Sequence, residues 1–251
     1  MTPQAARPRS GRVAERRERR AQRILDAAAE LVLRWGYDKT TVDDVARAAG
    51  VAKGTIYLHW KSREELFVAL LRRERAEMLA EVEAALTADP AAATLSGLLA
   101  RLTLALLRRP LLKAALLREA EVIGKLVRAK YDDPDRASRS EFARYLGVLR
   151  DQGLVRTDLP LAAQLHLIGA ATVGFLSAPT LIPGELWLPG EQAAELLAEA
   201  VDRALDRGRP LDPGETERLA AATMRFLGEM LSAARAKYHA SLDTAAAKDE
   251  P

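Results

Sequence analysis

Between residues 40 and 61 the sequence gathers short polar and cationic side chains that can donate hydrogen bonds to anionic oxygens. Thr41 precedes a helical pattern, and the free amides at a helix N-terminus bind phosphate. Lys53 can donate to guanine O6 and N7, and the methyl group of Thr55 can contact a thymine methyl. Gly54 allows another backbone to approach closely. This pattern favours binding of a nucleic acid over a chemical reaction.

An enzyme needs a constellation of catalytic groups, and the sequence contains none that we can identify. The three histidines, His59, His166 and His239, lie far apart in the sequence and have no metal-ligand spacing. Cysteine is absent, and there is neither a glycine-rich phosphate loop nor a nucleophile elbow. We therefore expect no enzymatic activity, no metal site and no cofactor.

Two short helical patterns must position the candidate contacts. In the first, Val42, Val45, Ala46 and Ala49 follow the spacing of one helix face. Thr41 is placed to cap it, with Asp44 at the reciprocal position of a capping box, and Gly50 suits the turn that follows.

The second pattern predicts a helix from about Lys53 to Trp60. Ile56 and Trp60 point inward, together with Val51, and this leaves four side chains toward solvent: Lys53, Thr55, Tyr57 and His59. Ser62 begins a third helix with a capping box. Two helices joined by a glycine turn form a helix-turn-helix unit, whose second helix lies in the major groove of DNA.

The segment from Ile24 to Leu71, which includes ILDAAAELVLRWGYDKTTVDDVARAAGVAKGTIYLHWKSREELFVAL, resembles the N-terminal domain of the TetR family of bacterial transcriptional regulators. The resemblance implies a homodimeric repressor that a ligand controls. The absence of cysteine and of a secretory signal leads us to expect a cytoplasmic protein. It also implies two kinds of DNA contact, with Lys53, Gly54 and Thr55 on base edges and Tyr57, His59 and Lys61 on the backbone. One departure is Ala52, where family members often carry a capping Ser. The expected DNA-binding set is Thr40, Thr41, Lys53, Gly54, Thr55, Tyr57, His59 and Lys61.

Charge is divided unevenly along the chain, whose formal net charge is +3. Residues 1–63 hold 14 basic and seven acidic side chains, and the remainder holds 24 and 28. A basic end on an acidic body indicates contact with a polyanion. The alternative is a helical protein whose basic end binds RNA or an anionic membrane surface. A membrane-surface helix needs a free apolar face, whereas here Ile56 and Trp60 are required inside the helix-turn-helix unit.

The whole chain is predicted to be all-α. We expect a helix-turn-helix domain at residues 13–62, a helical effector-binding and dimerisation domain at 63–240, and disordered tails at 1–12 and 241–251. The first helix should run from about Val13 to Trp35, with Trp35 and Trp60 in the core. A helix from Ser62 to about Leu86 should connect the two domains. There is no secretory signal and no run of about 18 apolar residues with membrane flanks, so we expect no membrane partner.

The helical pattern at residues 161–178 is apolar nearly all round and carries glycines that allow close approach of another helix. With residues 191–207, it is the predicted interface of a homodimer, which should bind a palindromic operator in double-stranded DNA. The resemblance places a small-molecule effector cavity within residues 95–178. Its apolar walls favour a mostly apolar effector, and the candidate lining is Leu102, Leu106, Leu117, Ile123, Tyr145, Leu149, His166 and Thr172.

Overall fold

The computed structural model describes residues 9–117 and 134–243, and these residues form helices with no strand among them. The helices are α1 (Arg9–Trp35), α2 (Val42–Ala49), α3 (Lys53–Tyr57), α4 (Arg63–Ala88), α5 (Leu95–Leu107), α6 (Pro110–Leu117), α9 (Pro134–Asp151), α10 (Leu161–Leu181), α11 (Gly190–Ala204) and α12 (Pro213–Asp243), with 3-10 turns η1 (Pro90–Ala92) and η2 (Gly184–Leu186). The all-α prediction is confirmed. Ile123 lies outside the described residues.

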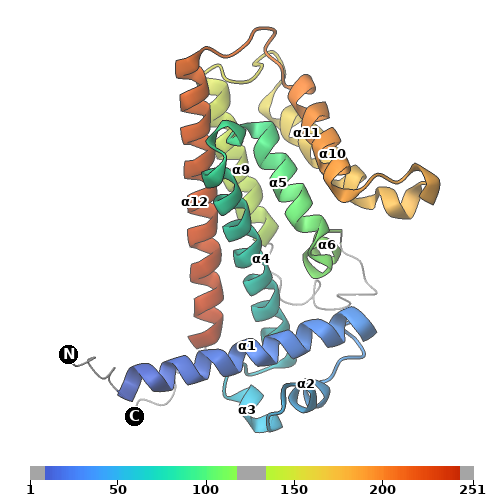
Figure 1. Cartoon of the computed structure of the whole chain (residues 1–251), viewed down its shortest axis with the longest axis vertical. Helices are drawn as coiled ribbons and strands as arrows, with labels where there is room; N and C mark the ends of the chain where they lie inside the picture. Colours follow the sequence, from blue (N-terminus) through green and yellow to red (C-terminus); the bar gives the residue numbers. More distant parts are fainter. Residues whose placement is uncertain (1–8, 118–133, 244–251) are drawn as a thin grey trace, which may run out of the picture.

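Helices α1, α2 and α3, here called the N-terminal unit, lie across one end of a taller body made of α4 to α12 (Figure 1). Two clusters of buried side chains correspond to these parts. The cluster of the N-terminal unit also takes in Leu111 and Leu112 of α6 and Tyr238 of α12. The unit is therefore packed against the body at more places than the α4 connection alone.

Local sequence signals set the ends of the short helices. The Thr41 hydroxyl accepts from the Asp44 amide, and the Asp44 carboxylate accepts from the Thr41 amide at 3.1 Å, so the predicted capping box is present. Gly50 has φ 63°, the left-handed conformation that ends α2 and that glycine adopts at least cost. Ser62 caps α4 by accepting from the Glu65 amide, while the Glu65 carboxylate accepts from Lys61 N at 2.9 Å.

Two sequence expectations about α1 need correction. The helix begins at Arg9 rather than Val13. Trp35 is 41% exposed, not in the core. The helix ends at Trp35, and Tyr37 is the aromatic residue that is buried instead. The Tyr37 ring meets the Phe67 ring edge-on, with centroids 5.0 Å apart. Trp60 is buried as predicted.

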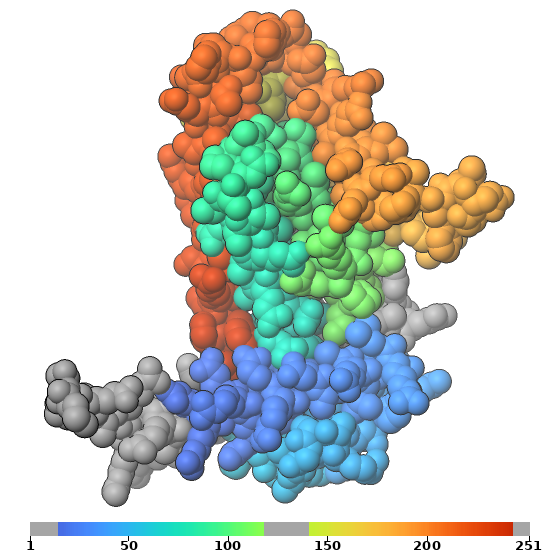
Figure 2. All heavy atoms as spheres, in the orientation of Figure 1, coloured from blue at the N-terminus to red at the C-terminus, as the bar shows by residue number. Residues whose placement is uncertain are grey.

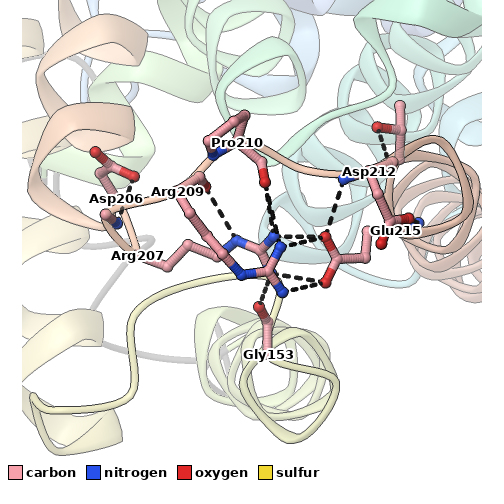
Figure 3. A network of polar contacts seen from close by, with 9 residues as sticks. Gly153, Asp206, Arg207, Arg209, Pro210, Asp212 and Glu215 are labelled. Carbon is pink, nitrogen blue, oxygen red and sulfur yellow. Dashed lines mark hydrogen bonds and ion pairs between the residues drawn. The ribbon is translucent and has the colours of Figure 1, made fainter.

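The last helix, α12, runs the full height of the body beside α4 (Figure 1). It continues to Asp243 with Ser241 buried, so the expected disordered tail does not begin at residue 241. Its start is fixed by Glu215, which accepts hydrogen bonds from Arg207 Nη1 at 3.0 Å and Arg209 Nη2 at 2.7 Å (Figure 3). These hydrogen bonds and the charges of the two guanidinium groups hold the pKa of the Glu215 carboxyl well below its usual range.

Helix α10 is apolar but is mostly uncovered in the protomer. Of the 18 consecutive residues of α10 with the highest mean hydropathy, only 17% are buried. By length and composition α10 is one helix that could cross a bilayer, which corrects the expectation that no segment reaches this threshold. A helix that packs against another protein chain has the same composition. The segment joining α10 to α11 stands out from the body (Figure 2) and exposes Leu186 and Trp187.

Candidate nucleic-acid interface

Helix α3 presents an exposed face built from residues spaced by three and four positions. Lys53, Gly54, Tyr57 and Lys61 are exposed, whereas Ile56 is buried against the N-terminal unit. Thr55 is half-buried beside them. Thr41 is exposed at the start of α2, where the free amides of a helix N-terminus can bind a phosphate. The structure therefore brings six of the eight expected contacts to accessible positions on α2, α3 and the turn after α3.

Lys53 is held by a neighbour in the free protein. Its Nζ lies 2.8 Å from Asp43 Oδ2, and this hydrogen bond and charge raise the pKa of Lys53. Both side chains are about half exposed, so the ion pair is weak and can exchange for a base or phosphate contact. Asp43 is itself exposed and adds negative charge beside Lys53 on this face.

Two of the expected contacts are buried. Thr40 has no exposed surface, and its hydroxyl donates to the Gly36 carbonyl at 2.9 Å. His59 is 2% exposed, so the expectation that it faces solvent is wrong. The reason is that α3 ends at Tyr57 rather than at Trp60, and a tight turn carries His59 inward beside the Trp60 ring, with ring centroids 5.2 Å apart. Thr40 and His59 therefore lie beneath the exposed face rather than on it.

Burial, together with the positive charges of Arg17 and Arg20, lowers the pKa of His59 from 6.5 to about 4. The neutral ring is thus favoured in the folded protein. Because the unfolded chain binds this proton at a higher pH than the folded chain, stability is full above pH 6.5 and is lost as pH falls from 6.5 towards 4. The loss is at most about 3 kcal/mol for such a shift, and less where solvent reaches the ring.

We therefore expect His59→Phe to flatten the pH dependence of unfolding between pH 4 and 6.5. Denaturant titrations of both proteins at several pH values measure this, and the difference between them removes the contribution of the carboxyl groups common to both. Parallel stability curves for the two proteins would show that His59 is not held neutral.

Sequence reasoning missed Leu58. Its side chain is 66% exposed, and it follows Gly54 by four residues on the same face of α3. An exposed apolar side chain at this position is suited to a thymine methyl group. The i, i+4 spacing from Gly54 is the signal that could have identified Leu58. An apolar residue in a predicted helix is not expected to contact DNA, so the sequence analysis does not include it.

The expected effector residues do not form one site. Leu102 and Leu106 line a cavity of about 170 Å³, here called the inner cavity, whose other walls come from α4, α6 and α12. Tyr145 lines a neighbouring cavity of about 240 Å³. The rings of Tyr145 and Phe226 stack with centroids 4.6 Å apart, and Phe226 lines both cavities.

The remaining expected lining residues lie elsewhere. Leu149 is fully buried in the body core, and Leu117 is not among the residues lining the inner cavity, although Leu116 is. His166 is exposed on α10, and the Thr172 hydroxyl donates to its own helix at the Ile168 carbonyl, 2.8 Å away. Restricting the site to residues 95–178 also left out the α12 wall, which consists of Phe226, Leu227 and Met230.

The exposed apolar surface of the body is concentrated on α10, α11 and their connection. Ala162, Gly169 and Val173 are exposed along one stripe of α10, and Leu196 is exposed on α11. Beside them is an apolar groove of about 700 Å³ that includes Phe175 and Trp187. The part of the chain that the structure describes contains no group of three or more acidic or histidine side chains that could hold a metal ion.

Comparisons with known proteins agree with this arrangement. Residues 24–70 match the family described as bacterial regulatory proteins, tetR family. The chain is 37% identical over 60 residues to a fatty acid metabolism regulator protein of Bacillus subtilis, covering 24% of this chain and 31% of that protein. It is 27% identical over 164 residues to the transcriptional repressor AcnR of Corynebacterium glutamicum, covering 62% and 79%.

Among solved structures, the chain is similar to a TetR-family transcriptional regulator from Rhodococcus sp., with 25% identity, a TM-score of 0.56, and coverage of 74% of this chain and 98% of that one. The chain spans about a third of the length of the Bacillus relative. The family match at residues 24–70 runs from the second half of α1 into the first turns of α4.

Proposed function

This chain belongs to the TetR family of bacterial regulatory proteins, and on that premise we propose that it is a sequence-specific DNA-binding repressor. It acts as a homodimer on a palindromic operator and is released by a small, mostly apolar effector. The observation that carries the proposal is the exposed face of α3, held by a capped α2 and a left-handed Gly50. That arrangement serves the insertion of α3 into a major groove.

The roles of the exposed side chains follow from their positions. Lys53 and Thr55, in the first turn of α3, are suited to base edges, and Leu58 adds an apolar contact. Tyr57, Lys61 and the N-terminus of α2 are suited to phosphates. Thr40 and His59, both buried, fix the turns that present these groups rather than touching the DNA.

Selection of bound duplexes from random DNA by the purified protein tests the proposal. We expect an enriched site with two inverted half-sites. Enrichment without any sequence in common, or tighter binding to single-stranded RNA or to anionic vesicles than to every duplex, would contradict it.

Gly54 allows a prediction that separates stability from recognition. A Cβ atom added at Gly54 meets nothing within 4 Å, so the fold does not require glycine there. Gly54→Ala should stabilise the protein by about 0.5–1 kcal/mol, because glycine is unfavourable inside a helix. It should nevertheless weaken operator binding, because the added methyl stands between α3 and the groove.

Thermal unfolding and operator affinity of Gly54→Ala measure the two effects on the same sample. A matched control is Ala48→Gly, an exposed position of α2 where the reverse change should destabilise the helix. Operator affinity of Gly54→Ala equal to that of the wild type would remove close approach as the reason for glycine at this position.

The homodimer is supported by the uncovered stripe on α10. Apolar patches of this kind mark interaction sites, and a two-fold axis through α10 and α11 would bury the same stripe on both copies. Val201 is fully buried within the protomer, so α11 contributes its outer residues, such as Leu196, rather than its inner face.

The effector is supported by the inner cavity, which has apolar walls and one charged residue, Arg75, among those lining it. A cationic side chain at the edge of an apolar cavity is suited to a molecule with an apolar part and an acidic group. The volume of about 170 Å³ is small for such a molecule. Binding therefore requires α6 or α12 to move outward, and this movement gives the effector its preference for one arrangement of the body.

A further inference from the structure

The C-terminal end of α12 is built into the N-terminal unit. Tyr238 is 7% exposed and packs within the buried cluster of that unit, and Leu242, one turn later, packs against the same cluster. Arg17 of α1 donates to the Leu242 carbonyl at 3.3 Å. Figure 1 shows the end of α12 meeting α1 beside the lower part of α4.

Polar contacts tie three helices together at this place. Gln22 Nε2 of α1 donates to the Tyr238 hydroxyl at 2.8 Å. Arg73 Nη1 of α4 lies 3.1 Å from Gln22 Oε1 and 2.7 Å from Asp26 Oδ1. Arg73 is 6% exposed, and its buried charge is compensated by Asp26 together with Glu74 and Glu77. Gln22 thus bridges α4 and α12, and the orientation of α1 is defined by both.

The same helix forms a wall of the inner cavity two turns earlier. Phe226, Leu227 and Met230 line the cavity. Met230 and Tyr238 are eight residues apart on a continuous helix, which is a rise of about 12 Å. A molecule that enlarges the cavity against Met230 displaces a rigid element whose other end holds α1.

We propose that Tyr238 is a positioning residue for DNA recognition and that α12 couples the inner cavity to the N-terminal unit alongside α4. The inference rests on the proposed function. With only α4 and the α6 contact at Leu111 and Leu112, the N-terminal unit could take other orientations about the end of α4. The contact at Tyr238 selects one of them. Loss of the contact lowers the fraction of dimers whose two recognition helices match successive major grooves, and the apparent operator affinity falls by that fraction.

The experiment uses the full chain and the operator obtained by selection, together with a duplex carrying one half-site. Tyr238→Phe keeps the ring and removes the hydrogen bond from Gln22. We expect affinity for the full operator to fall about fivefold, while affinity for the single half-site changes less than about twofold. Gln22→Leu should have the same effect, and the double variant should be no worse than either single one.

Ser232→Ala, at an exposed position of the same helix, is the control and should bind both duplexes as the wild type does. Unchanged binding of the full operator by Tyr238→Phe would overturn the proposal. An equal loss on both duplexes would also overturn it, because local damage to the N-terminal unit acts on each half-site. Failure of the wild-type protein to bind any selected duplex would instead remove the proposed function.

The cavity end of α12 is tested by Met230→Trp, which fills the inner cavity without an identified effector. We expect it to weaken full-operator binding in the wild-type background and to have a smaller effect when Tyr238 is already Phe. Equal effects in the two backgrounds would show that α12 does not carry the coupling. If Met230→Trp does not fold, the comparison of the two duplexes with Tyr238→Phe still decides the positioning role.

Discussion

Gly169→Arg is expected to convert the dimer into monomers and to lower affinity for the two-half-site operator by roughly 10²–10⁴-fold, the gain that linking two binding sites provides. Gly169 lies on the exposed stripe of α10, and a Cβ atom added there meets nothing within 4 Å of the protomer. The protomer can therefore accept the substitution. A charge introduced into a dry interface without a partner is strongly unfavourable, so association should fail.

Light scattering and operator titration on one preparation measure the two consequences of Gly169→Arg. Ala221→Arg places the same charge at an exposed position of α12, away from α10 and α11, and should leave both unchanged. Val201→Glu is not a suitable test of association, because Val201 has no exposed surface in the protomer and the change would disturb its core. A Gly169→Arg protein that remains dimeric would place the interface on other helices.

Features encoded over a few neighbouring residues could be predicted from the sequence. The capping box of Thr41, the left-handed turn at Gly50 and the cap at Ser62 each depend on contacts within four residues, and all three are present. The same is true of buried Ile56 and Trp60, which follow from helix periodicity. The long connecting helix was also predicted, to within two residues of its end at Ala88.

The sequence predictions fail where a helix ends earlier than its periodicity indicates, or where segments distant in the sequence meet. The sequence predicts His59 on the exposed face because the helical pattern continues to Trp60. Helix α3 instead ends at Tyr57, and the turn that follows directs the His59 side chain inward. Tyr238 gave no signal, since its partner Gln22 is 216 positions away. The cavity lining could not be predicted for the same reason. Leu102 of α5 and Phe226 of α12 line one cavity because their helices pack near each other, and the periodicity within a helix does not specify that packing.

The second large effect is the response of operator binding to salt. If each subunit neutralises three phosphates through exposed cations such as Lys39, Lys61 and Arg20, the dimer releases counterions from about six. The slope of log affinity against log salt is then about −5, and affinity falls roughly 10³-fold between 50 and 200 mM salt. Binding that changes less than about tenfold over this range would show that apolar contacts dominate and that the basic end has another purpose.

Two substitutions separate the contribution of phosphate contacts to affinity from that of base recognition. Lys61→Ala removes one phosphate contact from each subunit, so the slope should become shallower by about two and binding should weaken alike on every sequence. Thr55→Ala should leave the slope unchanged and cost roughly 1 kcal/mol at one base pair of each half-site, because it removes a methyl contact. Titrations of a panel of operator variants at several salt concentrations distinguish the two patterns. The same pattern from both variants would mean that Lys61 and Thr55 do not have separate roles. Base contacts could then not be attributed to the exposed start of α3 and phosphate contacts to the residues after its end.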